Sequence, residues 1–158
     1  MSWKTEFEAI LPMLGHRNWI LVVDKAYPMQ SAEGIETIYT GDKLINVLKH
    51  VLNCIQDEHH VKPIIYTDKE LLFMRDDLSK GVDAFKASLA QTIAKYKIEV
   101  IPHDEIFAKL DEASKLFNVL VLKTDSLMPY TSVFMELDCG YWSAEAERRM
   151  RAAMVAKP

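Results

Sequence analysis

Short continuous apolar runs, separated by longer segments in which apolar residues recur at helical spacing, most constrain the fold of this chain. The clearest run is Trp19-Ile20-Leu21-Val22-Val23. A run of this kind, bounded by turn residues, is typical of a strand that is buried on both faces. Further strands are predicted at 35–39, 64–66, 97–101, 118–124 and 132–137.

Helices are predicted between these strands, where apolar side chains fall on one face. In one such segment Leu44, Leu48, Val51 and Ile55 share a face. The predicted helices cover 3–14, 42–55, 82–96, 103–117 and 143–154. Helices that alternate with strands over this length predict an α/β fold, a three-layer αβα sandwich with a mixed, largely parallel sheet.

The length of 158 residues suits one compact domain. No internal repeat, low-complexity tract or linker divides the chain. We therefore expect one domain over residues 1–142 and a C-terminal helical tail over 143–158. The last turns of this tail are locally basic.

Charge and composition argue against several classes of partner. The formal net charge is -4 and no basic stripe runs along the chain, so nucleic acid is not expected as a partner. No apolar segment reaches the roughly 20 residues of a membrane span, and glutamates interrupt the N-terminal apolar stretch, unlike a signal peptide. Cys54 and Cys139 lie far apart without CxxC spacing. We expect a reduced, cytoplasmic protein that contacts no membrane.

Polar residues at the ends of the predicted strands are the candidate site residues. In α/β sheets, sites form at the carboxyl ends of strands and at helix N-termini. This rule selects Asp24 after the first strand, His103 at a helix start, and Asp125 and Tyr130 after the strand at 118–124. His16 precedes the first strand and therefore lies at the opposite end from Asp24. One chain alone is not expected to bring both into one pocket, so another subunit would complete it unless the strand is short and bent.

Structural roles for the same residues stay open at this point. A histidine after a helix-terminal glycine, such as His16, is often only a partner of the helix dipole, and Asp24 before a turn is commonly a turn residue. His103 has an alternative as a first-turn residue, and Tyr130 as edge packing. Three further histidines are read as solvated: His50, His59 and His60. Nucleotide-binding glycine loops, a serine-hydrolase elbow and HExxH are absent from the sequence.

The segment LGHRNWILVVDKAYP, at 14–28, resembles the opening motif of the ribose pyranase and fucose mutarotase (RbsD/FucU-type) family. That motif is Leu-Gly-His, a short apolar strand, then Asp and a nearby Pro. The resemblance continues through LINVLKHVLNCI, IPHDEIF, VLVLKTD and PYTSVFMELDCG, in the family's order. It covers about residues 8 to 142.

The resemblance implies site roles residue by residue. The family's proton donor falls on His16, and its sugar-binding aspartate falls on Asp24. Its basic residue before a helix falls on His103, where histidine resembles the ribose type. The family's Tyr-x-Asn falls on Tyr130 to Ser132, which makes both ends of that segment candidate sugar-binding residues.

The sequence also departs from the family pattern. Ser132 stands where the family has asparagine, so one side-chain amide is missing. The family's Gly-Glu pair is absent, and Asp125 is the nearest acid. Gly34 lies where a basic residue is expected, and the segment between His103 and Asp125 is longer by a few residues.

The resemblance implies a sugar mutarotase or pyranase of the isomerase class, which acts on a free monosaccharide such as ribose or fucose. Opening a cyclic sugar needs one proton removed and one delivered, for which a histidine suffices and no metal or other cofactor is required. A homo-oligomer with sites near subunit boundaries is expected. A non-catalytic sugar-binding or regulatory protein is the alternative, and a generic interaction domain is a third hypothesis.

Overall fold

The computed structural model describes residues 2–156, which contain six strands and the helices around them. The strands are β1 (Trp19–Val23), β2 (Ile35–Tyr39), β3 (Val61–Asp68), β4 (Lys97–Ile101), β5 (Val119–Lys123) and β6 (Val133–Cys139). They form one sheet in the order β2-β5-β1-β6-β3-β4. β6 pairs antiparallel with β1 and β3, whereas the other pairs are parallel. The predicted mixed, largely parallel sheet is confirmed.

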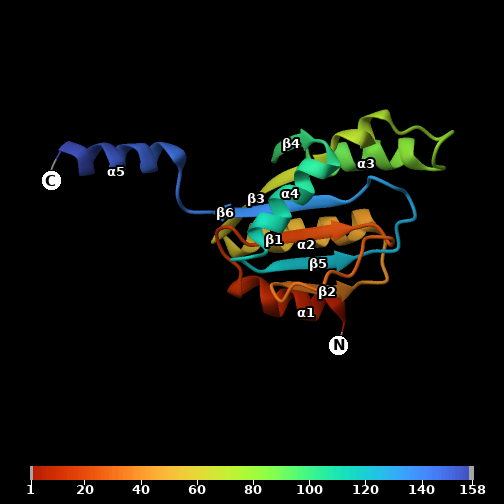
Figure 1. The fold of residues 1–158 in the computed structure, drawn as a ribbon, viewed down its shortest axis with the longest axis horizontal. Helices are drawn as coiled ribbons and strands as arrows, with labels where there is room; N and C mark the ends of the chain where they lie inside the picture. The colour runs from red at the N-terminus through yellow and green to blue at the C-terminus, as the bar shows by residue number, and fades with distance from the viewer. Residues whose placement is uncertain (1, 157–158) are drawn as a thin grey trace.

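Helices cover both faces of this sheet, so the predicted three-layer αβα sandwich is also confirmed (Figure 1). α1 (Trp3–Ile10), α2 (Leu44–Glu58) and α3 (Val82–Ile93) pack on one face. α4 (His103–Ala113) packs on the other face. Short 3₁₀ helices at Leu11–Met13 and Lys69–Phe73 follow α1 and β3. Within the described residues, no helix is long and apolar enough to cross a membrane.

β1 shows why a continuous apolar run predicts this architecture. Its side chains alternate between the two faces of the sheet. Ile20 and Val22 belong to the core under α1, α2 and α3. Trp19, Leu21 and Val23 belong to the core under α4. Because both faces are covered, all five positions are buried.

All five α-helices begin or end at other residues than predicted, for example α1 at Ile10 instead of Leu14 and α3 at Ile93 instead of Tyr96. α4 ends at Ala113 instead of Phe117, and the residues between them form turns. Gly34 lies against this turn, where a Cβ would stand 2.8 Å from the carbonyl oxygen of Ser114. Any larger residue would collide with backbone there, which explains why glycine stands at this position. α5 (Ala144–Ala156) contains no buried residue and lies apart from the sheet (Figure 1).

The topology brings chain-distant residues to one edge of the sheet. The carboxyl ends of β1, β3 and β4 meet there, and antiparallel β6 begins at the same edge. Residues that follow β1, β3 and β4 therefore meet residues that precede β6. This edge carries most of the candidate site.

Candidate functional site

Asp24 and Ser132 form a direct pair at this edge of the sheet. The Ser132 hydroxyl donates to Asp24 Oδ1 over 2.7 Å. The backbone N–H of Asp24 donates in return to Ser132 Oγ over 3.0 Å. Ser132 is buried, so it holds the aspartate in one orientation. These two candidates therefore lie together, and the serine hydroxyl anchors the aspartate.

His103 and Asp68 form a second pair beside the first. The distance from His103 Nδ1 to Asp68 Oδ1 is 2.9 Å. Pro102 precedes α4 and has no backbone N–H. The N–H of His103 donates to Glu70 Oε1 over 3.0 Å, which satisfies a helix terminus that would otherwise lack a partner. Asp68, the last residue of β3, thus holds the ring of His103, and Glu70, in the 3₁₀ helix after β3, holds its backbone.

Aromatic rings surround the His103 imidazole. Phe107 and Phe134 meet it edge-on, with ring centroids 4.6 and 6.1 Å away. Tyr130 stands edge-on at 5.8 Å. The backbone of Tyr130 has a φ of 61°, a left-handed conformation that costs energy for a residue with a bulky side chain. The strained turn presents this half-exposed ring beside the histidine.

Asp68 is a fully buried carboxylate with an unusual environment. Its side chain is 0% exposed, and its Oδ2 atom has no hydrogen-bond partner among the described residues. Burial raises the pKa of Asp68 to about 6, against the opposing effect of His103. The negative charges of Glu70 and Asp24 raise this pKa further. Asp68 therefore titrates close to physiological pH, as acid–base groups at functional sites often do.

Asp68→Asn is expected to change how stability depends on pH. Below about pH 4 the aspartate is protonated in both the folded and the unfolded chain. Between about pH 4 and 6 only the folded state keeps the proton, so Asp68 makes the free energy of unfolding fall as pH rises. The variant lacks this penalty. Its stability relative to the parent should increase by about 2 kcal/mol between pH 4 and pH 7.

Urea unfolding at several pH values measures this change. Asp111→Asn, at an exposed position of α4, checks for general effects of losing a carboxylate. A stability difference between Asp68→Asn and the parent that is equal at pH 4 and pH 7 would show that Asp68 is ionised throughout this range.

His16 lies at the opposite edge of the sheet, as expected from its place before β1. Its Nδ1 atom is 3.1 Å from Asp138 Oδ1, near the end of β6, and its side chain is 55% exposed. The turn that contains His16 is closed by Asn18, whose Oδ1 accepts from the N–H of Gly15 over 2.8 Å. A single chain therefore does not bring His16 to Asp24.

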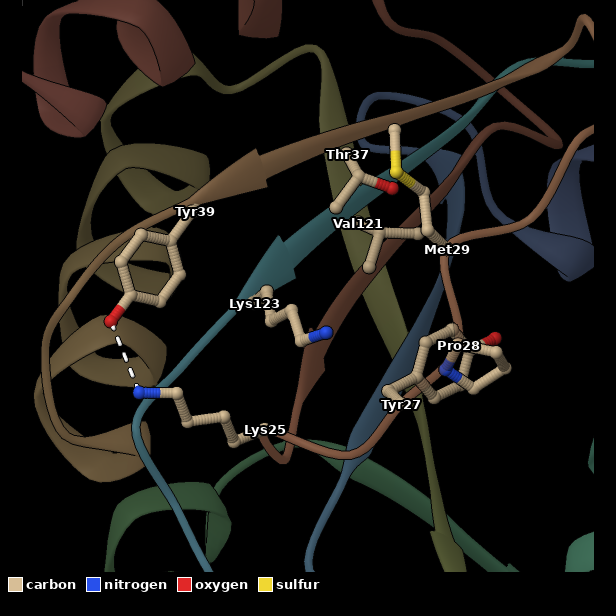
Figure 2. A pocket seen from close by; sticks show the side chains of 8 residues that line it. All are labelled: Lys25, Tyr27, Pro28, Met29, Thr37, Tyr39, Val121 and Lys123. Atoms are coloured by element: carbon tan, nitrogen blue, oxygen red, sulfur yellow. Dashed lines mark hydrogen bonds between the residues drawn. The ribbon is translucent and has the colours of Figure 1, made fainter.

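Asp125 lies in a separate corner, above the β2–β5 end of the sheet. Its Oδ1 accepts from the Tyr39 hydroxyl over 2.6 Å and from Lys25 Nζ over 3.3 Å. Figure 2 shows Lys25 reaching across to Tyr39 in the adjoining cavity of about 430 Å³. This cavity is lined by Lys25, Tyr27, Pro28, Met29, Thr37, Tyr39, Val121 and Lys123. Asp125 thus has its own partners and is not part of the Asp24 and His103 cluster.

The interpretation of the sequence missed Asp68 and Glu70. The segment Tyr66-Thr67-Asp68-Lys69-Glu70 follows an apolar run, as Asp24 does after β1. The rule that sites form at the carboxyl ends of strands therefore also selects Asp68 and Glu70.

The chain is similar to known proteins in both sequence and fold. The sequence model of the RbsD / FucU transport protein family matches residues 4–139. No curated protein matches the chain. The structure of Bacillus subtilis RbsD complexed with D-ribose superposes with a TM-score of 0.57 and 19% identity, over 88% of this chain and 94% of that one. FucU from Bifidobacterium longum superposes with a TM-score of 0.52 and 11% identity, over 84% and 92%.

Proposed function

Because this chain belongs to the RbsD / FucU transport protein family, we propose that it binds a free monosaccharide and interconverts its cyclic forms by acid–base ring opening. A neighbour of the same fold is complexed with D-ribose, which supports a ribose-like sugar as the ligand. The observation that carries the proposal is the meeting of two polar pairs, Asp24 with Ser132 and Asp68 with His103, at one edge of the sheet.

The cluster has the chemistry of a sugar site. Sugars present hydroxyls that donate to carboxylates and apolar ring faces that pack on aromatic side chains. Asp24 offers a carboxylate whose orientation Ser132 fixes. Tyr130 offers a half-exposed ring with a hydroxyl. Together they would bind one face and several hydroxyls of a pyranose.

Ring opening requires two proton transfers. The anomeric hydroxyl loses its proton as the bond between the anomeric carbon and the ring oxygen breaks, and the ring oxygen gains a proton. Closing on the other face of the carbonyl, or through another hydroxyl, reverses both transfers, so the overall reaction consumes nothing. Histidine suits both directions at neutral pH. His103, oriented by Asp68, would act on one side of the sugar.

We assign the second proton-transfer group to His16 of a neighbouring copy. His16 lies at the edge opposite to Asp24 in its own chain, and it is half exposed, so another chain can reach it. This assignment requires a homo-oligomer in which the opening motif of one copy meets the Asp24 edge of the next.

A non-catalytic sugar-binding protein is the second candidate. Ser132 supports it, because its hydroxyl is engaged with Asp24. A side-chain amide that could bond a sugar hydroxyl is missing at this position. Exchange NMR on a panel of pentoses, hexoses and deoxyhexoses separates the two functions. Accelerated exchange between anomers, or between pyranose and furanose, supports catalysis. Saturation transfer without exchange supports binding alone.

Asp24→Asn is expected to weaken binding of the best sugar at least about tenfold, because hydrogen bonds to charged groups contribute about 1.5–3 kcal/mol. The amide is similar in size and can still accept from Ser132, so the fold should be kept. Titration calorimetry gives the dissociation constant. Asp125→Asn is the matched control, because that aspartate lies outside the cluster. An unchanged dissociation constant for Asp24→Asn would assign Asp24 to the turn after β1.

A further inference from the structure

Three side chains of types that ligate metals meet at the contact between α1 and α2, outside the proposed sugar site. Glu8 comes from α1, and His50 and Cys54 come from successive turns of α2. Positions four apart share one face of a helix, so the imidazole and the thiol point the same way. All three ligand atoms lie within 4.8 Å of one another.

The distances in this trio match the edges of a zinc coordination tetrahedron. Zinc binds sulfur at about 2.3 Å and nitrogen or oxygen at about 2.0–2.2 Å, so tetrahedral ligand atoms lie about 3.4–3.6 Å apart. His50 Nε2 is 3.5 Å from Cys54 Sγ and 3.3 Å from Glu8 Oε1. Cys54 Sγ is 3.9 Å from Glu8 Oε1. Only the thiol–carboxylate edge has to shorten, and Glu8 can do this because its side chain is 52% exposed.

The surroundings hold His50 in place. Trp3 meets its ring edge-on with centroids 5.2 Å apart, and Phe7 does so at 6.3 Å. The His50 side chain is 22% exposed, so the prediction that this histidine is solvated is wrong. α1 covers the face of α2 that carries it. A ring fixed by packing loses little freedom when it binds a metal.

The local charge favours a cation. The carboxylates of Glu8, Asp57 and Glu58 all lie close enough to Cys54 to interact with it electrostatically. A divalent cation would supply the positive charge that this cluster lacks.

We propose that Glu8, His50 and Cys54 form a binding site for a divalent metal ion of the zinc class, with one coordination position open to solvent. A thiolate and an imidazole together select zinc or cobalt over magnesium and calcium, which prefer oxygen ligands. The ion would join α1 to α2. It takes no part in ring opening, so this site and the sugar site are tested separately.

Cobalt titration of the reduced, untagged protein is the direct experiment. One equivalent of Co²⁺ per chain should produce a thiolate-to-metal charge-transfer band and the intense visible bands of tetrahedral cobalt. Zn²⁺ should displace it, and excess Mg²⁺ should not. Zn²⁺ at a hundredfold excess over its dissociation constant should also raise Tm by about 5 °C or more.

Variants identify the ligands. Cys54→Ser should abolish the charge-transfer band, and Glu8→Gln and His50→Gln should each weaken zinc binding by at least about tenfold. Cys139→Ser and Glu6→Gln are matched controls on the second cysteine and on an exposed glutamate of α1, and both should bind like the parent. Glu8 and Glu6 are exposed, so these two variants should fold equally well. No charge-transfer band in the parent, or a band that survives Cys54→Ser, would overturn the proposal.

Discussion

His16→Ala is expected to slow sugar exchange by about 10²- to 10⁴-fold, the usual contribution of a positioned general acid or base. The proposed mechanism gives this residue one of the two proton transfers, and alanine cannot perform it. The fold should remain intact, because the His16 side chain is 55% exposed and contacts Asp138 at the surface. Exchange NMR under saturating sugar measures the rate, and circular dichroism checks the fold.

A second histidine variant controls for general effects. His59 ends α2 with a φ of 64°, a conformation that asparagine tolerates, so His59→Asn should fold and exchange sugars like the parent. His103→Gln gives the opposing comparison. If His16→Ala exchanges sugars at the parental rate while His103→Gln does not, proton transfer belongs to the His103–Asp68 pair within one chain. His16 is then only a surface partner of Asp138.

The sheet could be predicted from the sequence because its central strands are covered on both faces. In β1 every position must be apolar, which leaves an unbroken run that is easy to read. The end of α4 was harder to predict. Leu116 and Phe117 continue the helical spacing, yet the chain turns after Ala113, where the Ser114 carbonyl meets Gly34. The spacing of apolar residues within one segment gives no information about such a contact between distant segments.

The candidate site was only partly predictable for a related reason. Asp24, His103 and Ser132 are recognisable because each adjoins an apolar strand or a helix start. Asp68 lies in Val61–Asp68, which also contains Lys62 and Pro63, so only its centre reads as a strand. Pro63 is tolerated because pairing with β4 begins at Ile64. The real length of β3 depends on pairing with β6 at its start and with β4 at its end, where Asp68 pairs with Ile101.

The position of His16 relative to Asp24 determines what kind of assembly the mechanism needs. β1 separates the two residues along its whole length, and its five residues rise about 3.3 Å each. Neither side chain can span that distance. A pocket that contains both must therefore combine two copies of the chain, each lending one end of its first strand. In a closed symmetric oligomer, every copy would contribute its His16 to the pocket of one neighbour and have its own pocket completed by the His16 of a neighbour.

A mixture of two impaired variants tests this assembly directly. His16→Ala keeps the Asp24 edge, and Asp24→Asn keeps His16, so a pocket shared between them can contain both native groups. After dilution, reconcentration and random mixing of equal amounts, about one quarter of the pockets should be intact. Exchange at sugar concentrations well below the dissociation constant should therefore recover to about a quarter of the parental rate. If each pocket were instead built within a single chain, no pocket in the mixture would contain both native groups. A monomer by light scattering, or a mixture as slow as each variant alone, would place all the chemistry in the His103–Asp68 cluster of a single copy.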